Sequence, residues 1–144
     1  MLEWLNEYRA ILHLLLHVCV PALVAWLVVA IMAFQGRYAQ SIGAAGFSWL
    51  KAFLILIGTM VVDADHLLAT PIYAPGRCSI FFHPLHQLLP IVLYGLATVW
   101  PFGVRFLLGR PLSSRDHWIG WIGLGLLIHM GLDWSDCVWM RATA

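Results

Sequence analysis

Ten histidine and aspartate residues form four groups along the chain. The groups are His13 with His17; Asp63, Asp65 and His66; His83 with His86; and His129, Asp133 and Asp136. Neutral imidazoles and carboxylates are typical ligands of first-row divalent metals, here zinc, manganese or non-haem iron. Such a centre favours hydrolysis, because a bound ion lowers the pKa of water toward about 7 and polarises a phosphoryl or acyl oxygen.

The spacing inside two of the groups is that of one helix face. His13 and His17 are four residues apart, which places both on the same side of a helix. His129, Asp133 and Asp136 are separated by steps of four and three, which again makes a single stripe. Helix bundles build metal sites from inward-facing side chains of this kind, so the spacing supports a metal centre between helices.

Roles within the predicted centre are assigned only in part. We expect the direct ligands to be His17, Asp63, His66, His83, His86, His129 and Asp133. Asp63 and His66 are three residues apart, whereas Asp65 points elsewhere. His13 is a further candidate ligand, while Asp65 and Asp136 are the candidate catalytic residues. Each of these three could bind the ion, orient a ligand or act as general base. The expected cofactor is one or two Zn²⁺ ions, with Mn or Fe as alternatives.

Two other interpretations of the histidines compete with this one. A single histidine in a membrane helix is more often a hydrogen-bonding core group than a ligand, so no group predicts a metal by itself. Haem is also held by paired histidines, but aspartates belong to the set and the sequence has no C-x-x-C-H motif. A metal centre is therefore favoured by the four groups together.

The elements that must position these residues are membrane helices. The chain has 144 residues, of which 62% are hydrophobic and 10% charged, against roughly 25% charged in a soluble domain. Its net charge of +1 gives no basic face for nucleic acid. A spanning helix needs about 20 apolar residues, and four segments qualify: about 4–34, 47–69, 84–108 and 115–139. The prediction is one all-α domain over residues 1–144, a four-transmembrane-helix bundle.

Local signals set the ends and contacts of these helices. Pro84 suits a first helical turn and would place His83 at the N-cap and His86 in that turn. Ser113 followed by Asp116 resembles a capping box. Glycines of the fourth segment allow close approach to a neighbouring helix; they are Gly120, Gly123 and Gly125.

Four alternating spans bring all four groups to one membrane face. The opposite face then has five basic residues, which are Arg37, Lys51, Arg105, Arg110 and Arg115. The face with the site has three, which are Arg9, Arg77 and Arg141. The positive-inside rule places the 35–46 and 109–115 loops in the cytoplasm and the metal site on the periplasmic side. His117 falls at the opposite end from the four groups.

Two of the three cysteines fall on the predicted periplasmic face. Cys78 precedes His83, and Cys137 follows Asp136. Since that compartment is oxidising, we expect a disulfide between them. Free thiols or zinc-bound thiolates are the alternatives, and Cys19 is expected to be a packing residue.

Four segments in this order resemble a family of small bacterial membrane proteins of unknown function: "HLLLHVCVPALVAWL", "VVDADHLLATPIY", "RCSIFFHPLHQ" and "LLIHMGLDWSDC". They are also similar to inner-membrane metal-dependent hydrolases described as LexA-binding. The resemblance implies a bacterial inner-membrane location and site residues at His13 or His17, Asp63 with Asp65 and His66, His83 with His86, and His129 with Asp133. Those hydrolases have H-R-G-x-T-H-S where this chain has H-P-L-H, which leaves the substrate open. A more distant similarity to zinc-dependent phospholipase C implies phosphoester chemistry.

Two functions follow as expectations. The first is a membrane-embedded metal-dependent hydrolase acting on a phosphoester or lipid-linked substrate, with Arg77 as the nearest cation for an anionic group. The second is an accessory transmembrane subunit of a larger membrane complex, with a structural or redox metal. A hydrolase needs an open coordination position and a path for substrate, whereas a structural metal is fully coordinated by protein.

Overall fold

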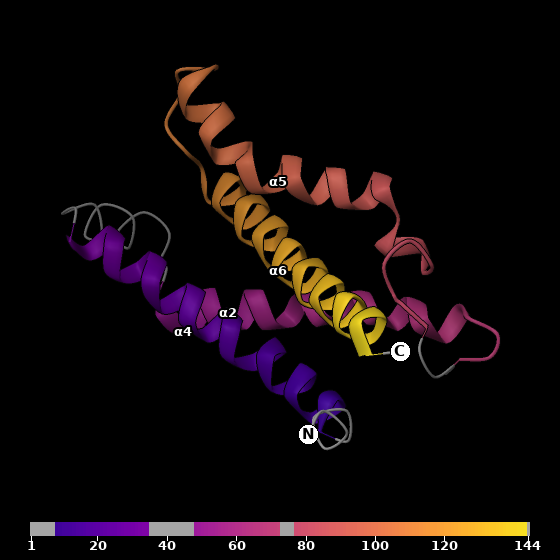
Figure 1. The fold of residues 1–144 in the computed structure, drawn as a ribbon. Coiled ribbons are helices and arrows are strands. Elements are labelled where there is room, and N and C mark those ends of the chain that lie inside the picture. The colour runs from indigo at the N-terminus through magenta and orange to yellow at the C-terminus, as the bar shows by residue number, and fades with distance from the viewer. Residues whose placement is uncertain (1–7, 35–47, 73–76, 144) are drawn as a thin grey trace.

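The described part of the chain is built from helices and short connections, without a strand. The computed structural model describes residues 8–34, 48–72 and 77–143. It contains four α-helices, α2 (Arg9–Phe34), α4 (Trp49–Gly58), α5 (Leu88–Phe106) and α6 (Ser114–Thr143), and two 3₁₀ helices, η1 (Thr59–Leu68) and η2 (Pro84–His86) (Figure 1). The prediction of an all-helical fold is confirmed, and the predicted cytoplasmic loop at 35–46 lies outside the described residues.

Two of the described helices are long and apolar enough to cross a membrane. They are the Arg9–Met32 part of α2, with 24 residues, and α5, with 19 residues. The second predicted span divides instead, because α4 ends at Gly58 and the chain continues as the 3₁₀ helix η1. The fourth, α6, is 30 residues long but includes Asp116, Asp133 and Asp136. Length and composition therefore support two spans in the described residues rather than four.

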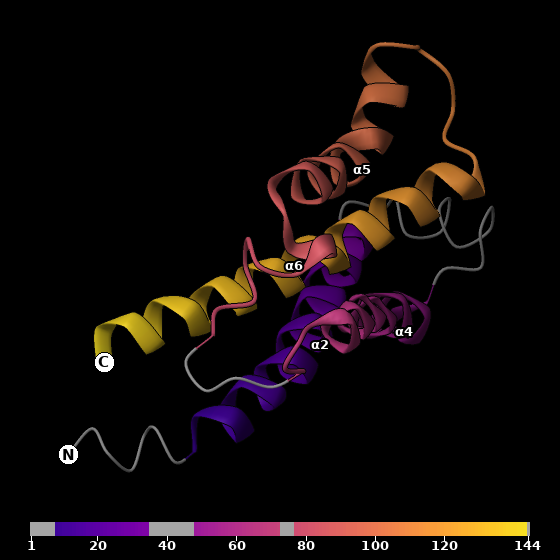
Figure 2. The same ribbon diagram turned by 90° about the vertical axis from the view of Figure 1, so that its right-hand side faces the viewer.

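The longest helix, α6, is the element on which the others pack. It runs along α5 and crosses α2 and α4 (Figures 1 and 2). In both views the start of α2 and the end of α6 lie at the same end of the molecule. The four groups of polar residues lie toward that end.

Glycines of α6 allow two close helix contacts. A Cβ atom at Gly123 would lie 2.5 Å from the backbone nitrogen of Thr98 in α5. A Cβ atom at Gly125 would lie 2.7 Å from Cγ2 of Thr59, where η1 begins. The predicted close approach is confirmed, and it fixes both α5 and η1 against the helix that carries His129 and Asp133.

The first turn of α6 is held by its capping residues. Ser113 donates to Oδ2 of Asp116 from its backbone nitrogen at 2.8 Å and from its hydroxyl at 2.6 Å. Trp100 of α5 donates to Oδ1 at 2.8 Å, and Arg110 binds both oxygens. The predicted capping box is confirmed, and it also ties the end of α5 to the start of α6.

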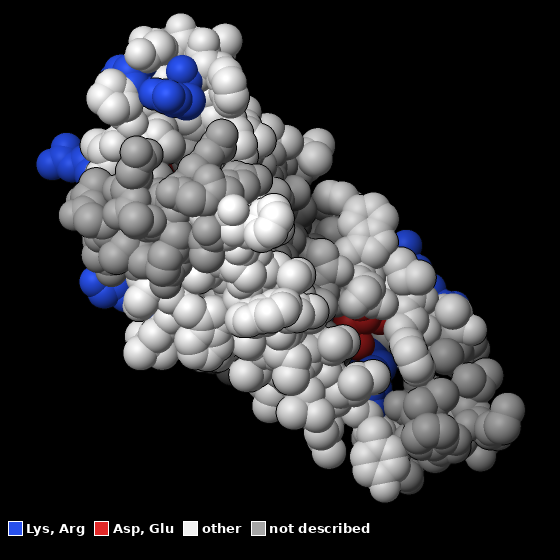
Figure 3. Space-filling model, turned by 90° about the vertical axis from the view of Figure 1, so that its left-hand side faces the viewer, with Lys and Arg blue, Asp and Glu red and all other residues white. Residues whose placement is uncertain are grey.

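Most large apolar side chains face outward. One small buried cluster joins α2, α4 and α6 through Ala25, Ala52, Leu56 and Trp121. Along α2 and α5, by contrast, large apolar residues are exposed, including Leu15, Leu23, Trp26, Leu96 and Phe102. Figure 3 shows a face with Lys and Arg toward its ends, a broad uncharged area between them, and acidic atoms in a recess. Extended exposed apolar surface of this kind marks contact with a membrane or a partner.

Candidate metal centre

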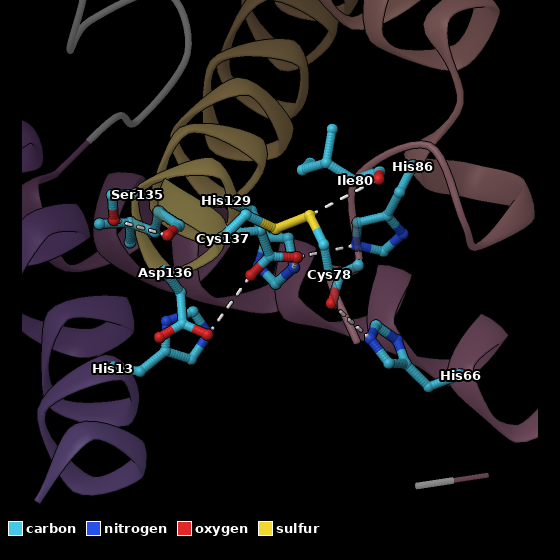
Figure 4. Close-up of a disulfide and its surroundings, with 12 residues drawn as sticks. His13, His66, Cys78, Ile80, His86, His129, Ser135, Asp136 and Cys137 are labelled. Carbon is cyan, nitrogen blue, oxygen red and sulfur yellow. Dashed lines mark hydrogen bonds and ion pairs between the residues drawn. A yellow bond between two sulfur atoms is a disulfide. The ribbon is translucent and has the colours of Figure 1, made fainter. Parts of the chain in front are cut away.

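The carboxylate of Asp133 lies at the centre of the polar groups. Its Oδ1 is 3.3 Å from Nε2 of His13 and 3.6 Å from Nε2 of His17, both in α2. Its Oδ2 is 3.0 Å from Nε2 of His86 and 3.6 Å from Nε2 of His129. Asp133 is 5% exposed. Figure 4 shows His13 on one side of the end of α6, and His86 and His66 on the other.

Four side chains around Oδ2 form a set that we call the inner quartet: Asp63, His86, His129 and Asp133. Oδ1 of Asp63 is 3.0 Å from Nε2 of His129 and 3.5 Å from Nε2 of His86. One potential ligand atom of each member lies within 4.8 Å of those of the others. Three members are buried, and the side chain of Asp63 is 41% exposed. The quartet is therefore open to the outside only at Asp63.

A second set, the outer trio, consists of His13, His17 and Asp133, with ligand atoms that also lie within 4.8 Å of one another. His17 is buried, while the side chain of His13 is 31% exposed. The outer trio shares Asp133 with the inner quartet.

The buried atoms of both sets fit a cation. Nε2 of His17, Nε2 of His86 and Oδ2 of Asp133 are buried and have no hydrogen-bond partner among the described residues. Nε2 of His86 and Oδ2 of Asp133 are 3.0 Å apart, yet they lack hydrogen-bond geometry. Buried polar atoms are normally paired, and nitrogen and carboxylate donors that converge without pairing match the ligand preferences of zinc, manganese or iron.

Asp65, a predicted catalytic residue, lies behind His86. Its Oδ2 accepts from Nδ1 of His86 at 3.3 Å and from the backbone nitrogen of Leu85 at 2.7 Å. A carboxylate in this position fixes the tautomer and the orientation of a metal-binding imidazole. Asp65 therefore directs Nε2 of His86 toward the inner quartet.

His66 and His83 lie beside the inner quartet. Nδ1 of His66 is 3.2 Å from Oδ1 of Asp65, and its Nε2 is 3.1 Å from the hydroxyl of Ser79. His66, Asp65 and His86 form a third set of neighbouring ligand atoms. The ring of His83 stacks on His66 at 3.7 Å between centroids, and His83 belongs to none of the three sets.

The turn before α5 follows the predicted pattern at Pro84. His83 is the N-cap of η2 and Pro84 its first residue, with His86 at its end. The preceding Phe81 has a positive φ of 66°, which is uncommon for a large residue. Its nitrogen donates to the carbonyl of His86 at 3.0 Å, so this strained turn holds His86 in place.

His86 carries the most perturbed imidazole outside the long helices. Burial lowers the pKa of His86, but the neighbouring carboxylates of Asp133 and Asp63 outweigh burial and raise the pKa to about 10. Without an ion, His86 is therefore protonated at neutral pH. For His83, burial and the adjacent His66 lower the pKa, which favours a neutral ring.

Two arginines lie near the polar groups. Arg9 donates to Oδ2 of Asp136 at 3.3 Å, and both side chains are partly exposed. Arg77 donates to the carbonyls of Pro71 and Ile72 and lies 4.5 Å from the centre of the Phe82 ring, and its role as the cation for an anionic group stays a prediction. Arg9 precedes His13 by four residues, and this spacing could have identified it. Asp136 lies at the rim and belongs to none of the three ligand sets.

The predicted disulfide is confirmed. Cys78 and Cys137 are bonded (Figure 4), with 5.1 Å between their Cα atoms. Cys19 is a free, exposed cysteine. Cys137 follows Asp133 by four residues, and Cys78 precedes the turn that carries His83 and His86. The bridge therefore fixes this turn against the end of α6.

An apolar groove of about 680 Å³ lies among residues of α4, η1, α5 and α6, and no member of the inner quartet lines it. Its walls include Val62 and Leu85, which are the chain neighbours of Asp63 and His86. Ile122 of α6 and Lys51 of α4 also line it. The volume is within the range of ligand pockets, about 300–1,000 Å³.

Comparison with known proteins identifies a family without a known activity. The chain matches the family of unknown function DUF6122 over residues 7–140. No curated protein and no solved structure matches it.

Proposed function

We propose a function from the candidate metal centre and the helices around it, because the chain belongs to the DUF6122 family, whose function is unknown. The protein is a membrane-embedded metal-dependent hydrolase in which the inner quartet holds a divalent ion, with Zn²⁺ favoured and Mn or Fe as alternatives. The observation that carries this proposal is the set of buried, unpaired ligand atoms around Oδ2 of Asp133.

The residues around such a centre would have different roles. The ion, when bound, supplies Lewis-acid activation of water at neutral pH. Asp65 orients His86, and the partly exposed Asp63 leaves one side of the quartet accessible. Arg9 is placed at the rim to bind an anionic group, and its partner Asp136 is the candidate general base. An accessible side supports a hydrolase over the alternative of an accessory subunit with a purely structural metal.

A membrane location is supported by the helices and by the disulfide. The segments α2 and α5 are long and apolar enough to span, and their large apolar residues face outward. We propose that α4 with η1 and α6 complete a four-span bundle in the bacterial inner membrane, as the resemblance to the inner-membrane hydrolases implies. The Cys78–Cys137 bridge favours the oxidising periplasmic side for the site.

The substrate that fits best is a phosphoester lipid. The groove is lined mainly by apolar side chains, including Val62, Leu85 and Ile122. Val62 and Leu85 are the chain neighbours of Asp63 and His86, so an acyl chain at that part of the groove would bring its headgroup toward the metal centre. A phosphate there would bind the ion of the inner quartet.

The test uses the full chain in detergent micelles with phosphoester lipids of short and long acyl chains. Hydrolysis should be lost on chelation and restored by Zn²⁺, and it should be absent in the double variant His129→Ala/Asp133→Ala. Ile122→Trp, which fills the groove, should slow hydrolysis of long-chain lipids and spare short-chain ones. His117→Ala, in the first turns of α6, is the control. Hydrolysis that persists in the double variant would overturn the proposal.

A further inference from the structure

We propose that Asp133 bridges two divalent ions, one in the inner quartet and a second held by His13 and His17 of the outer trio. The inference rests on the proposed function and extends its metal centre from one ion to two. Its basis is that the two oxygens of one buried carboxylate face two different pairs of imidazoles.

The two oxygens of Asp133 lie nearest to different imidazoles, although the rings of His17 and His129 contact each other at 4.6 Å between centroids. Oδ1 faces α2, with Nε2 of His13 at 3.3 Å and Nε2 of His17 at 3.6 Å. Oδ2 faces the other side, with Nε2 of His86 at 3.0 Å and Nε2 of His129 at 3.6 Å. One ion bound at Oδ2 would leave the α2 pair without a function, although His17 is only 2% exposed.

The tautomer of His17 points to a cation on the α2 side. Its Nδ1 is 2.9 Å from the carbonyl oxygen of His13, which can only accept, so Nδ1 carries the proton. In the neutral ring Nε2 then presents a lone pair toward Oδ1 of Asp133, and Nε2 has no hydrogen-bond partner among the described residues. A lone pair facing a carboxylate is repulsive unless a proton or a metal ion lies between them. At 3.6 Å from Oδ1, Nε2 is too far away to donate a hydrogen bond to the carboxylate, and this separation leaves room for a metal ion.

The same arrangement recurs at His86. Its Nδ1 lies 3.3 Å from the Asp65 carboxylate, which leaves Nε2 directed toward Asp133 and Asp63. Two imidazoles on opposite sides of Asp133 are thus each fixed through Nδ1 by a different acceptor. Each imidazole is therefore oriented as a metal ligand would be, one on each side of the carboxylate.

The two positions differ in how many protein ligands they offer. The inner quartet supplies four groups, whereas the outer trio supplies three and includes the partly exposed His13. A three-ligand site keeps a position for water or substrate. The second ion would therefore be the more accessible one, beside Arg9 and Asp136. Paired ions are typical of enzymes that cleave phosphoesters, which agrees with a phosphoester substrate.

The experiment counts Mn²⁺ ions and tests whether they are coupled. Metal-free full-length protein in detergent is loaded with Mn²⁺, and the bound metal is measured by elemental analysis and electron paramagnetic resonance. We expect two ions per chain with an exchange-coupled spectrum. His13→Ala/His17→Ala should bind one ion per chain with an uncoupled spectrum, while His117→Ala should keep two coupled ions. The single variant His13→Ala, at a partly exposed position, guards against misfolding and should also lose the coupled signal.

The possible results distinguish a failure of the two-ion inference from a failure of the proposed hydrolase function. One uncoupled ion in the wild type, or two coupled ions in the double variant, would overturn the bridged pair. The first result would leave the hydrolase with a single ion in the inner quartet. Binding of no ion by the wild-type protein would overturn both.

Discussion

Oδ2 of Asp133 lies 3.0 Å from Nε2 of His86, and the two buried atoms are not hydrogen-bonded to each other. One belongs to the C-terminal half of α6 and the other to a 3₁₀ turn that precedes α5. Both atoms therefore converge on a shared point, at which a divalent ion would contact both of them.

The role of Asp65 is tested by Asp65→Asn. Since Asp65 orients His86 and belongs to neither the inner quartet nor the outer trio, the variant should still bind metal, but with affinity lowered about 10–100-fold, as is typical when a partner that orients a ligand is lost. Competition with a chromophoric chelator measures the affinity. Asp136→Asn is the matched control and should bind metal as the wild type does. An unchanged affinity in Asp65→Asn would show that His86 does not need this carboxylate.

Metal binding should release protons. The pKa of His86 is about 10 without an ion, so below pH 10 the ring carries a proton that a metal ion must displace. Affinity should therefore fall as pH falls from 9 to 6, by up to about tenfold per pH unit for each displaced proton. Calorimetry at pH 7.5 in buffers of different ionisation enthalpy measures the protons released. The proposed role of His86 as a ligand would be contradicted if none were released.

The close contact between α5 and α6 makes Gly123 intolerant of a side chain. A Cβ atom there would lie 2.5 Å from the Thr98 backbone nitrogen, and backbone cannot move aside as a side chain can. Gly123→Ala should cost about 1–3 kcal/mol in the free energy of unfolding, as overpacking does. Gly95→Ala, in open space within α5, should be neutral or slightly stabilising. Denaturation in detergent compares the two, and equal stability would contradict the described helix contact.

Loss of the disulfide should weaken both the fold and the metal centre. The bridge spans 59 residues, so its removal should destabilise by up to about 4 kcal/mol on the chain-entropy estimate. Cys78→Ser/Cys137→Ser frees the turn that carries His86 from α6, and metal affinity should fall with stability. Cys19→Ser is the matched control and should change neither. Peptide mass spectrometry without reduction should find Cys78 linked to Cys137, and free thiols at both positions would contradict the bridge.

Helical spacing was enough to predict the parts of the site that lie on regular helices. His13 with His17, and His129 with Asp133, meet as their four-residue spacing indicates. The place of Pro84 after His83 likewise predicted the N-cap. Both features depend only on local backbone geometry, which sequence determines well.

Features that depend on irregular backbone were not predicted. The second span changes from α-helix to 3₁₀ helix after Gly58, and the position of Asp65 behind His86 follows from that change. Arg77 is bound by carbonyls of the loop before it, and Arg9 pairs with Asp136. No periodic pattern encodes such contacts, because they depend on where separate segments meet.

The most direct test of the metal centre is elemental analysis of the full-length protein, purified in detergent and dialysed after loading with Zn²⁺. We expect at least one tightly held ion per chain in the wild type and in His117→Ala, and none in His129→Ala/Asp133→Ala. A wild-type protein that retains no metal, or a double variant that retains as much as the wild type, would contradict a metal centre at Asp133.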